Sequence, residues 1–452
     1  MSRTIPTLGG ALPVLGHFLE YNRDLLGFLR RAYAEGGPVV RYRLAFEELV
    51  MISGPAANEA FFRAPEDQLS NREAYRKSQT PIFGPGIIFD VPLDVHMEQL
   101  QMQMGALRDG SMRNYAPQIA EETDRAMADW GTSGTVDFLD FMGSLAMYAS
   151  ARTLLGKQFR DHTTDEFAAL YHDLEAAVNP LSYFFPNLPL PVFRRRDRAR
   201  ARLGELVSTV IAERRRTGET GDDMLQHLME VHYKDGRPLS DYEITGLLLF
   251  LLFAGHHSTS VSTVWTMIEL HRNPEWLAKV RDEIDRVYPS ATDPVTFQSL
   301  RDSEVLHRAV KETLRKNPPL VMMMRKVLYD FEFDGYVVPA GTLVVNSPAV
   351  GHYLPEVYRE PERFDPDRFS DARHEDENPY AYTAFGGGKH RCLGMNFAFL
   401  QIKTMVTSLL RAFDFELAGD RYEPALGRLI IAPESPCRFH YRRRETPQRV
   451  AA

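Results

Sequence analysis

One glycine-rich loop with a single cysteine, Phe385–Gly394, constrains this 452-residue chain more than any other feature. It reads Phe-Gly-Gly-Gly-Lys-His-Arg-Cys-Leu-Gly. The glycines tolerate positive φ and carry no Cβ, so the backbone can fold tightly beneath a flat ligand. His390 and Arg391 lie beside Cys392, and cations with free backbone N–H groups lower a cysteine pKa and favour the metal-binding thiolate. An isolated cysteine is usually a small buried hydrophobe, but in this loop Cys392 is a candidate metal ligand.

The register of this loop resembles the haem-binding signature of the cytochromes P-450. The pattern Phe-x-x-Gly-x-[Arg/His]-x-Cys-x-Gly is matched at Phe385, Gly388, His390, Cys392 and Gly394. The resemblance implies a mainly α fold with a minor β region. It also implies haem b, held between a long oxygen-binding helix and the cysteine loop, with the Cys392 thiolate as the axial metal ligand.

The bulk composition is that of an ordinary globular protein. The chain exceeds the usual single-domain length, yet one large helical unit remains possible, and we find no repeat, low-complexity tract or linker. We therefore expect a single domain over residues 1–452, with no fused reductase. The 53 basic and 61 acidic side chains give a net charge of −8, which argues against general nucleic-acid binding. Nothing in the use of two cysteines suggests an oxidising compartment.

The N-terminal segment Met1–Gly16 lacks a basic region followed by an apolar core, so we expect neither a signal peptide nor a membrane anchor. The most apolar stretch, Gly246–Gly255, is far shorter than the ~20 residues that span a bilayer. Microsomal members of the resembled family carry an anchor before a proline-rich hinge, and Pro6 and Pro13 resemble that hinge. These features predict a soluble, bacterial, cytoplasmic protein.

Periodicity predicts a helix-rich chain with a small sheet. Helical spacing dominates from Glu121 to Met267, and the charges of the basic helix Arg194–Arg216 are expected on a solvated face. Further helices are expected over Val305–Leu314 and Phe397–Phe413. The expected strands are a hairpin of Pro38–Leu44 with Glu47–Ser53, the segments Val327–Phe333, Tyr336–Val338 and Thr342–Asn346, and a returning hairpin over Leu429–Tyr441.

The segment Glu243–Leu270 changes character halfway along a predicted helix. An apolar half is followed by Ala-Gly-His-His-Ser-Thr-Ser over Ala254–Ser260, so the polar half of a buried helix must face something that satisfies it. Ala254 and Ser258 share a face, and small side chains there would let a flat ligand lie close. Hydroxyls in this cluster can also bond back to carbonyls one turn earlier and bend the helix. The alternative to a ligand site is a buried helix with a polar patch at a packing defect.

The two histidines in this segment, His256 and His257, are a separate question. As neighbours they are not expected to point at one metal from one helical face, and no His-Glu-x-x-His spacing exists. A zinc site is therefore not expected here. His257 facing a pocket, as a group that titrates near neutral pH, is the favoured interpretation.

This segment resembles the oxygen-binding helix of the cytochromes P-450. Most members read Ala-Gly-x-[Asp/Glu]-Thr-[Thr/Ser], where the acid and the hydroxyl deliver protons to dioxygen. A histidine at the acid position, as in His257, is similar to the sterol 14α-demethylase branch, whose bacterial members read Ala-Gly-His-His-Thr-Ser. Here Ser258 and Thr259 stand in swapped order. The resemblance implies catalytic roles for His257 and Ser258, with Thr259 as a possible substitute, and a haem contact for Ala254.

Two further groups of residues gain roles from the resemblance. Glu312-Thr-Leu-Arg315 matches the Glu-x-x-Arg of the family, and Arg368 is expected to complete a structural trio in preference to Arg363. The haem carboxylates are expected to meet His390, Arg325 and Tyr75, through charge-assisted bonds that fix the ring. Many members have Trp-x-x-x-Arg in an early helix; His96 and Gln101 lie in that region without matching it, so that contact is unassigned.

The segment Tyr75–Asp90 resembles the substrate loop of the sterol demethylases, most strongly at Thr80–Gly84 and Gly86–Asp90. Weaker matches at residues 127–130 and 156–161 extend the likeness over nearly the whole chain. The loop departs from the family at Lys77 and Ser78, where an aromatic residue or leucine is usual. An apolar pocket is expected around Phe83, Phe253, Leu320, Met322, Leu429 and Ile430.

The resemblance implies a haem-thiolate monooxygenase similar to sterol 14α-demethylase, acting on a sterol-like lipid with dioxygen and inhibited by azoles. Electrons would come from a ferredoxin and its reductase, with Lys389 and Arg391 as docking candidates. The altered loop favours an alternative, a monooxygenase of the same branch acting on another terpenoid, polyketide or fatty acid. A peroxide-driven or isomerising haem-thiolate enzyme is a second alternative, against which the Ser258–Thr259 hydroxyls argue. A haem sensor or carrier would need no oxygen-binding helix.

Overall fold

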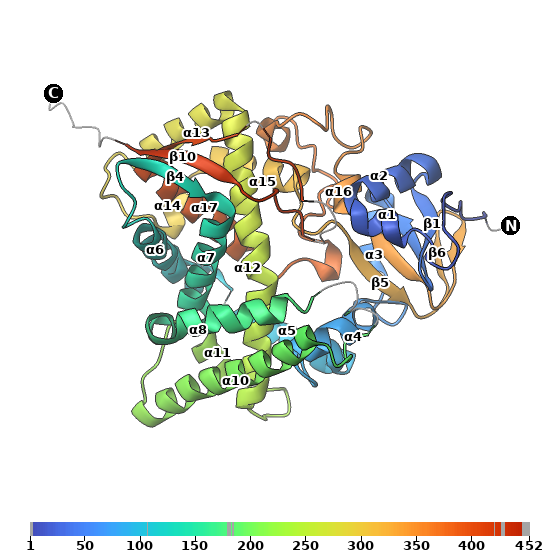
Figure 1. Ribbon diagram of the computed structural model, residues 1–452, viewed down its shortest axis with the longest axis horizontal. Coiled ribbons are helices and arrows are strands. Elements are labelled where there is room, and N and C mark those ends of the chain that lie inside the picture. The colour runs from blue at the N-terminus through green and yellow to red at the C-terminus, as the bar shows by residue number, and fades with distance from the viewer. Residues whose placement is uncertain are drawn as a thin grey trace.

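The computed structural model describes residues 3–105, 107–178, 182, 185–419, 421–425 and 430–444. A 32-residue helix, α12 (Asp241–Arg272), crosses the middle of the molecule (Figure 1). It begins at a capping box in which the Ser240 hydroxyl accepts from the Glu243 N–H while the Glu243 carboxylate accepts from Ser240. At 1.5 Å per residue it is roughly 48 Å long, enough to connect both ends of the protein.

The other helices surround α12, and the prediction of a mainly helical chain with a minor β region is confirmed. α12 packs against α7, α10, α15 and α17. The α-helices are α1 (Phe18–Arg23), α2 (Leu25–Gly36), α3 (Pro55–Arg63), α4 (Asn71–Phe83), α5 (Leu93–Gly105), α6 (Asp109–Ala126), α7 (Phe138–Ser150), α8 (Lys157–Glu175), α10 (Pro191–Thr217), α11 (Met224–Glu230), α13 (Pro274–Val287), α14 (Phe297–Arg301), α15 (Glu304–Lys316), α16 (Pro348–Gly351) and α17 (Met395–Ala412). Short 3-10 or π turns lie at η1 (Ile88–Asp90), η2 (Ala151–Leu155), η3 (Pro366–Phe369) and η4 (Gly388–His390).

The strands of the described residues form three small sheets, and the largest lies with α1 and α2 on the right in Figure 1. Its order is β1-β2-β8-β5-β3, with β2 and β8 parallel and the other pairs antiparallel. The expected early hairpin is confirmed by the register of Val39 with Ile52. The strands are β1 (Val39–Leu44), β2 (Glu47–Ile52), β3 (Leu69–Ser70), β4 (Ser133–Asp137), β5 (Met323–Val327), β6 (Phe331–Phe333), β7 (Tyr336–Val338), β8 (Leu343–Asn346), β9 (Phe413–Leu417) and β10 (Arg438–Arg443).

Two strand predictions are corrected. The segment expected as one strand over Val327–Phe333 is divided between β5 and β6, which belong to different sheets, because the Leu328 N–H turns to the Gln68 carbonyl. The returning hairpin also pairs differently. β10 lies between β4 and β9, and residues 432–434 pair with residues 423–425; Leu429 itself lies outside the described residues.

α12 is also the one helix of the described residues that is long and apolar enough to cross a membrane by length and composition. The apolar stretch Gly246–Gly255, which alone is too short to span a bilayer, is one part of this longer helix. In the structure most of the apolar part of α12 is covered by neighbouring helices, because this helix forms the centre of the core. Its remaining polar stretch is what positions the site.

Candidate active site

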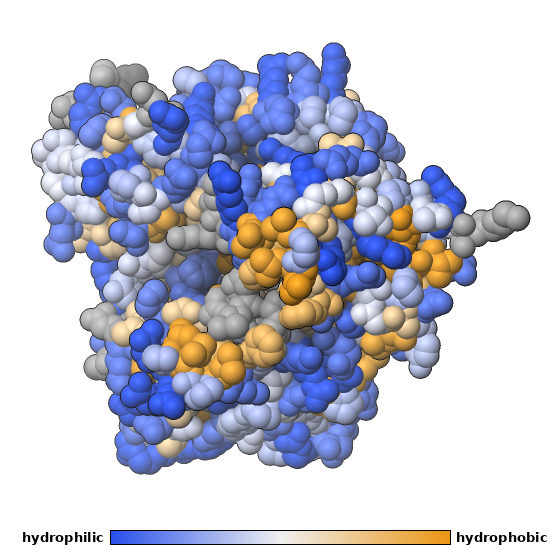
Figure 2. Space-filling view, turned by 45° about the vertical axis from the view of Figure 1, so that its right-hand side comes forward, coloured by the Kyte–Doolittle hydropathy of each residue, from blue (hydrophilic) through white to orange (hydrophobic). Residues whose placement is uncertain are grey.

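The middle of α12 is open on one side although the helix is a core element. Ala254 is exposed, and Gly255, His257 and Ser258 are partly exposed. The Ser258 hydroxyl donates to the Ala254 carbonyl, one turn earlier, at 2.9 Å. Exposed small residues in the centre of a buried helix must line a hollow. Figure 2 shows apolar side chains gathered near the middle of one face of the protein, beside a recess in that face.

Thr259, the expected substitute alcohol, does not share this hollow. Its side chain is 2% exposed, and its hydroxyl donates to Gln401 Oε1 on α17 at 3.3 Å. Consecutive helical residues point about 100° apart, so Ser258 and Thr259 face different neighbours. The structure therefore brings Ser258, and not Thr259, to the open side.

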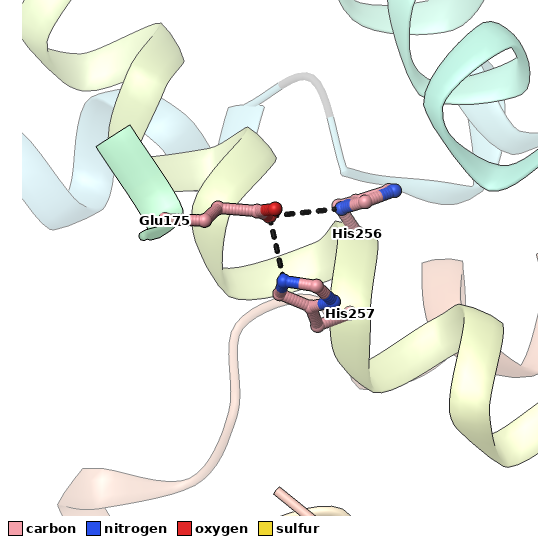
Figure 3. Close-up of side chains that lie close together, drawn as sticks. All are labelled: Glu175, His256 and His257. Carbon is pink, nitrogen blue, oxygen red and sulfur yellow. Dashed lines mark hydrogen bonds and ion pairs between the residues drawn. The ribbon is translucent and has the colours of Figure 1, made fainter. Parts of the chain in front are cut away.

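His257 reaches a residue that the sequence did not indicate. Its Nε2 lies 2.8 Å from Oε1 of Glu175, at the end of α8, and His256 Nδ1 lies 3.1 Å from the same oxygen (Figure 3). Burial tends to raise the pKa of Glu175, but hydrogen bonds from the two histidines outweigh it and lower the pKa to about 2. The carboxylate is therefore ionised at neutral pH. Glu175 belongs to no local sequence motif, and it meets His257 only because the end of α8 lies beside α12 in the folded protein.

The cysteine loop is built as its glycines predict. The Cys392 N–H donates to the Phe385 carbonyl at 2.8 Å, closing the loop. Gly386 has a φ of +69°, and a Cβ there would lie 2.6 Å from the His390 carbonyl oxygen. Gly388 also has positive φ, at +53°, and Gly394 is the N-cap of α17. Only glycine fits such a close approach at a left-handed position.

The Cys392 thiol shows two opposing properties. It is exposed to solvent, yet burial among protein atoms raises its pKa, opposed by a bond to Gly394. The expected lowering by neighbouring cations is therefore wrong. Burial, then the charge of Arg325, lowers the pKa of His390 to about 4, so this ring is neutral. Arg391 is exposed, and its Nη2 lies 3.2 Å from the Met395 sulfur. A bound metal ion would supply the missing positive charge and stabilise the thiolate.

The residues expected to bind the haem carboxylates lie close together. Arg325 is 2% exposed, and burial lowers its pKa to about 10, partly offset by Glu66. Its guanidinium donates to the carbonyls of Phe61, Ala64 and Leu69. The charge of Arg325 lowers the pKa of His390, and His96, whose own pKa is lowered by burial, acts more weakly in the same direction.

Tyr75 belongs to the same group of residues, because its hydroxyl accepts the N–H of Met324, the neighbour of Arg325 on β5, at 3.1 Å. His96, on α5, lies near His390, in the region where the sequence offered no match for a further carboxylate contact. A cluster of Arg325, His390 and His96 with Tyr75 beside it fits a ligand that carries two carboxylates. Together with the thiol, this set fits haem.

A buried ionic network supports the cysteine loop. The Glu312 carboxylate binds Arg315 at 2.8 and 2.9 Å and Arg368 at 3.1 Å, and all three side chains are fully buried. Arg363, the less favoured candidate, is exposed and pairs instead with Glu360. The structure thus brings together the expected trio.

His352 connects this network to the loop, and sequence reasoning missed it. Arg315 donates to the His352 carbonyl at 2.7 Å, and His352 Nδ1 lies 3.0 Å from the Arg315 carbonyl. His352 Nε2 accepts the Thr383 N–H at 2.9 Å, and the Thr383 carbonyl accepts the Gly386 N–H. Burial, then the charge of Arg315, lowers the pKa of His352 to about 3, which matches a neutral ring with one donor and one acceptor nitrogen.

Apolar residues line the expected substrate side from two directions. Phe83 and Phe253 pack edge to face with ring centroids 5.6 Å apart. Leu320, which is 46% exposed, forms an antiparallel bridge with Ile430. Met322 is buried, and its sulfur accepts the Tyr21 hydroxyl at 3.6 Å. Leu429 lies outside the described residues.

The departure at Lys77 and Ser78 lies on α4. Lys77 is exposed, whereas Ser78 is buried and donates to the Tyr75 carbonyl at 3.1 Å. A short side chain therefore occupies the inward position.

A second hollow, of about 910 Å³, lies on the surface beside the cysteine loop. It is lined by Phe385, by the glycines Gly386–Gly388, and by Arg391. Lys389 is exposed in the same loop. Part of the loop backbone can thus be reached from outside the protein.

Comparison with known proteins agrees with this geometry. A family model described as Cytochrome P450 matches residues 6–439. The chain belongs to the cytochrome P450 family. It is 39% identical to a sterol 14alpha-demethylase of Mycolicibacterium vanbaalenii over 98% of each chain. It is 37% identical to an obtusifoliol 14-alpha demethylase of Sorghum bicolor, over 98% of this chain and 91% of the relative.

A lanosterol 14-alpha demethylase of Bos taurus is 35% identical over 98% of this P450 and 88% of the relative. The solved structure of a cyanobacterial CYP120A1 with bound retinoic acid matches with a TM-score of 0.88 at 24% identity. It covers 98% of this chain and 100% of its own, and shows the shared fold. This P450 is thus an oxidoreductase of the sterol 14-demethylase-like group, a monooxygenase that uses dioxygen, haem with a cysteine thiolate ligand and a redox partner.

Proposed function

We propose that this P450 removes a methyl group from a sterol-like lipid, as a 14α-demethylase. The observation that carries the proposal is the open stretch of α12, where Ser258 and the Glu175-bound His257 lie beside Ala254. Similarity to demethylases named for sterol, obtusifoliol and lanosterol supports the substrate class.

The residues divide the work between binding and proton transfer. Bound haem would supply the oxidising chemistry at its iron. Cys392 would hold that iron. The loop beneath it would be shaped by Phe385, Gly388 and Gly394. The ring would be oriented through its carboxylates by Arg325, His390 and Tyr75. Phe83 and Phe253 would exclude water on the substrate side, together with Leu320, Met322, Leu429 and Ile430.

The proton route would run through α12. The ionised Glu175 accepts from His257 Nε2, which leaves Nδ1 of that ring available to the hollow. Ser258 Oγ can exchange its bond to the Ala254 carbonyl for one to a ligand in the hollow. Thr259 is poorly placed for this role because its hydroxyl is bound to Gln401.

The electron source would be a ferredoxin with its reductase. It would dock over the 910 Å³ hollow beside the cysteine loop, where Arg391 lines the hollow and Lys389 is exposed. Opposite charge on the partner would steer the encounter. We further propose a single domain, a cytoplasmic location and inhibition by azoles, which would occupy the hollow above Ala254.

One observation favours a second candidate, a monooxygenase of the same branch that hydroxylates another terpenoid, polyketide or fatty acid. Ser78 is buried on α4 at a place where the resembled family has a larger apolar side chain. A smaller residue leaves room for a substrate of different shape.

Two measurements test these assignments. Dithionite-reduced protein with carbon monoxide should show the strongly red-shifted Soret band of thiolate ligation, which Cys392→Ala should abolish and Cys437→Ala should retain. Titration with sterols, triterpenes and fatty acids should then give a low-to-high spin shift with lanosterol-like compounds, and turnover should release the 14-methyl group. A spin shift with another lipid class alone would replace the demethylase by the second candidate.

A further inference from the structure

We propose that Glu175, His256 and His257 form a binding site for one divalent cation of the zinc type, beyond the proposed oxidation chemistry. One oxygen of the Glu175 carboxylate and one nitrogen from each of the two rings lie within 4.8 Å of one another. Figure 3 shows both rings turned toward the same Glu175 oxygen. Neighbouring histidines on one helix were not expected to point at one metal. In the structure both rings nevertheless turn toward one oxygen of Glu175, which α8 supplies.

His256 is already oriented as a metal ligand. Its Nε2 lies 2.9 Å from the Gly143 carbonyl oxygen, which can only accept, so Nε2 carries the proton. His256 Nδ1 faces Glu175 Oε1 at 3.1 Å, a contact that needs a proton between the two atoms. A bound cation can take the place of that proton and be held by both atoms. A carbonyl that fixes the second nitrogen is the usual support of a metal-bound histidine.

The donor set selects the class of cation. Two imidazoles and one carboxylate form a zinc-type set that leaves a fourth position open for water. Calcium and magnesium prefer oxygen ligands, whereas zinc, copper and nickel accept imidazole. Ligand atoms around a tetrahedral zinc ion are about 3.3 Å apart. Each histidine nitrogen, at 2.8 or 3.1 Å from the Glu175 oxygen, needs only a small outward shift, and the two nitrogens lie within 4.8 Å of each other.

Access and surroundings also fit. The His257 side chain is 38% exposed, so a cation can enter from the hollow, whereas His256 is buried. The ring of Tyr171 packs edge-on against His256 at 5.4 Å, and burial, then the charge of Glu175, raises the pKa of its hydroxyl well above the usual value. Hydrogen-bond interaction with Glu175 adds to this rise, so the Tyr171 hydroxyl lies beside the candidate site.

Occupancy would block turnover. A cation on His257 Nε2 replaces the hydrogen bond to Glu175, so the ring can no longer exchange a proton there. This consequence rests on the proposed function, whereas cation binding does not. Cys392 belongs to a separate loop, so its ligation should be unaffected.

The test uses the full chain loaded with haem, which keeps Cys392 occupied, and Zn²⁺ as the probe. Equilibrium binding should show one tight zinc equivalent, and zinc K-edge absorption should show two imidazole ligands. Glu175→Gln and His257→Ala should each weaken binding at least tenfold. His172→Ala removes an exposed histidine one turn earlier on α8 and should leave the affinity unchanged. The carbon monoxide band of each variant reports whether it remains folded around its haem.

Equal zinc affinity in wild type, Glu175→Gln and His257→Ala would overturn the site, as would loss of affinity with His172→Ala. Substoichiometric zinc bound without imidazole ligands would overturn it as well. Zinc bound by this cluster with unchanged turnover would leave the site standing and would overturn the proton role of His257. Failure of the site and failure of the proposed function are therefore distinguishable.

Discussion

The cysteine side and the α12 side of the haem site differ in how their polar groups are satisfied. On the cysteine side Glu312, Arg315 and Arg368 are fully buried and bonded to one another and to backbone carbonyls. On the α12 side Ser258 bonds back to its own helix, and His257 is partly exposed. Buried ionic networks hold one geometry, because loss of a partner leaves an unpaired charge. The protein thus fixes the metal ligand and leaves freedom where substrate and protons must move.

The strongest test of this difference is Glu312→Ala. It leaves the guanidinium groups of Arg315 and Arg368 buried without their carboxylate, so we expect unfolding to become easier by about 3–5 kcal/mol. Urea unfolding followed by circular dichroism measures the change, and the carbon monoxide band measures haem retention. Glu360→Ala is the control, because its pair with Arg363 is exposed and should leave stability nearly unchanged. Equal effects of the two variants would contradict the rigid character of the cysteine side.

A pair of glycine substitutions compares the two sides directly. Gly386→Ala places a Cβ at positive φ, 2.6 Å from the His390 carbonyl, and should cost about 1–3 kcal/mol with faster loss of haem. At Gly255, in the middle of α12, a Cβ meets nothing within 4 Å. Gly255→Ala should therefore raise stability by about 0.5–1 kcal/mol through helix propensity. Thermal unfolding of both variants is the measurement, and a loss at Gly255 equal to that at Gly386 would show that the α12 side is closed.

The cysteine side was the more predictable part, because most of its signals are short sequence patterns, although Arg368 lies 56 positions from Glu312. The loop Phe385–Gly394 and Glu312-x-x-Arg315 are short patterns, and the β1–β2 hairpin follows from local alternation. The pKa of Cys392 was predicted in the wrong direction, since burial depends on how the loop packs and not on its neighbours in sequence.

Contacts between distant segments could not be predicted. Glu175 meets His257, 82 positions further along the chain, only because α8 ends beside α12. His352 joins α15 to the cysteine loop through backbone groups that no side-chain pattern records. The choice between Ser258 and Thr259 likewise depends on Gln401 of α17, which occupies one of the two directions.

His352 predicts how the cysteine side responds to acid. The folded protein holds its pKa at about 3, whereas an unfolded histidine has a pKa of about 6.5. Below about pH 6.5 the unfolded state binds a proton that the folded state does not, so stability is full above that pH and falls until about pH 3. This one group contributes up to about 1.4 kcal/mol per pH unit.

His352→Gln keeps a donor and an acceptor but does not titrate. It should flatten the decline in unfolding free energy between pH 6 and 4, measured by urea unfolding at several pH values. His440→Gln, at an exposed position on β10, serves as the control and should leave the slope unchanged. An unchanged slope in His352→Gln would mean that this ring is already charged in the folded protein.

The smallest change in stability is expected at Ser258, on the open side. Ser258→Ala removes a hydroxyl that only bonds back to its own helix, so the free energy of unfolding should change by less than about 0.5 kcal/mol. Turnover should nevertheless fall by about 100-fold, because the positioned proton donor is lost. Thr259→Val should behave in the opposite way. It leaves the buried side-chain oxygen of Gln401 without its hydrogen-bond donor, which should lower the free energy of unfolding by about 1–3 kcal/mol. Turnover should stay close to that of the wild type. A loss of turnover in Thr259→Val with full activity in Ser258→Ala would show that α12 rotates when the haem and substrate are bound, and that the open side is not the one seen here.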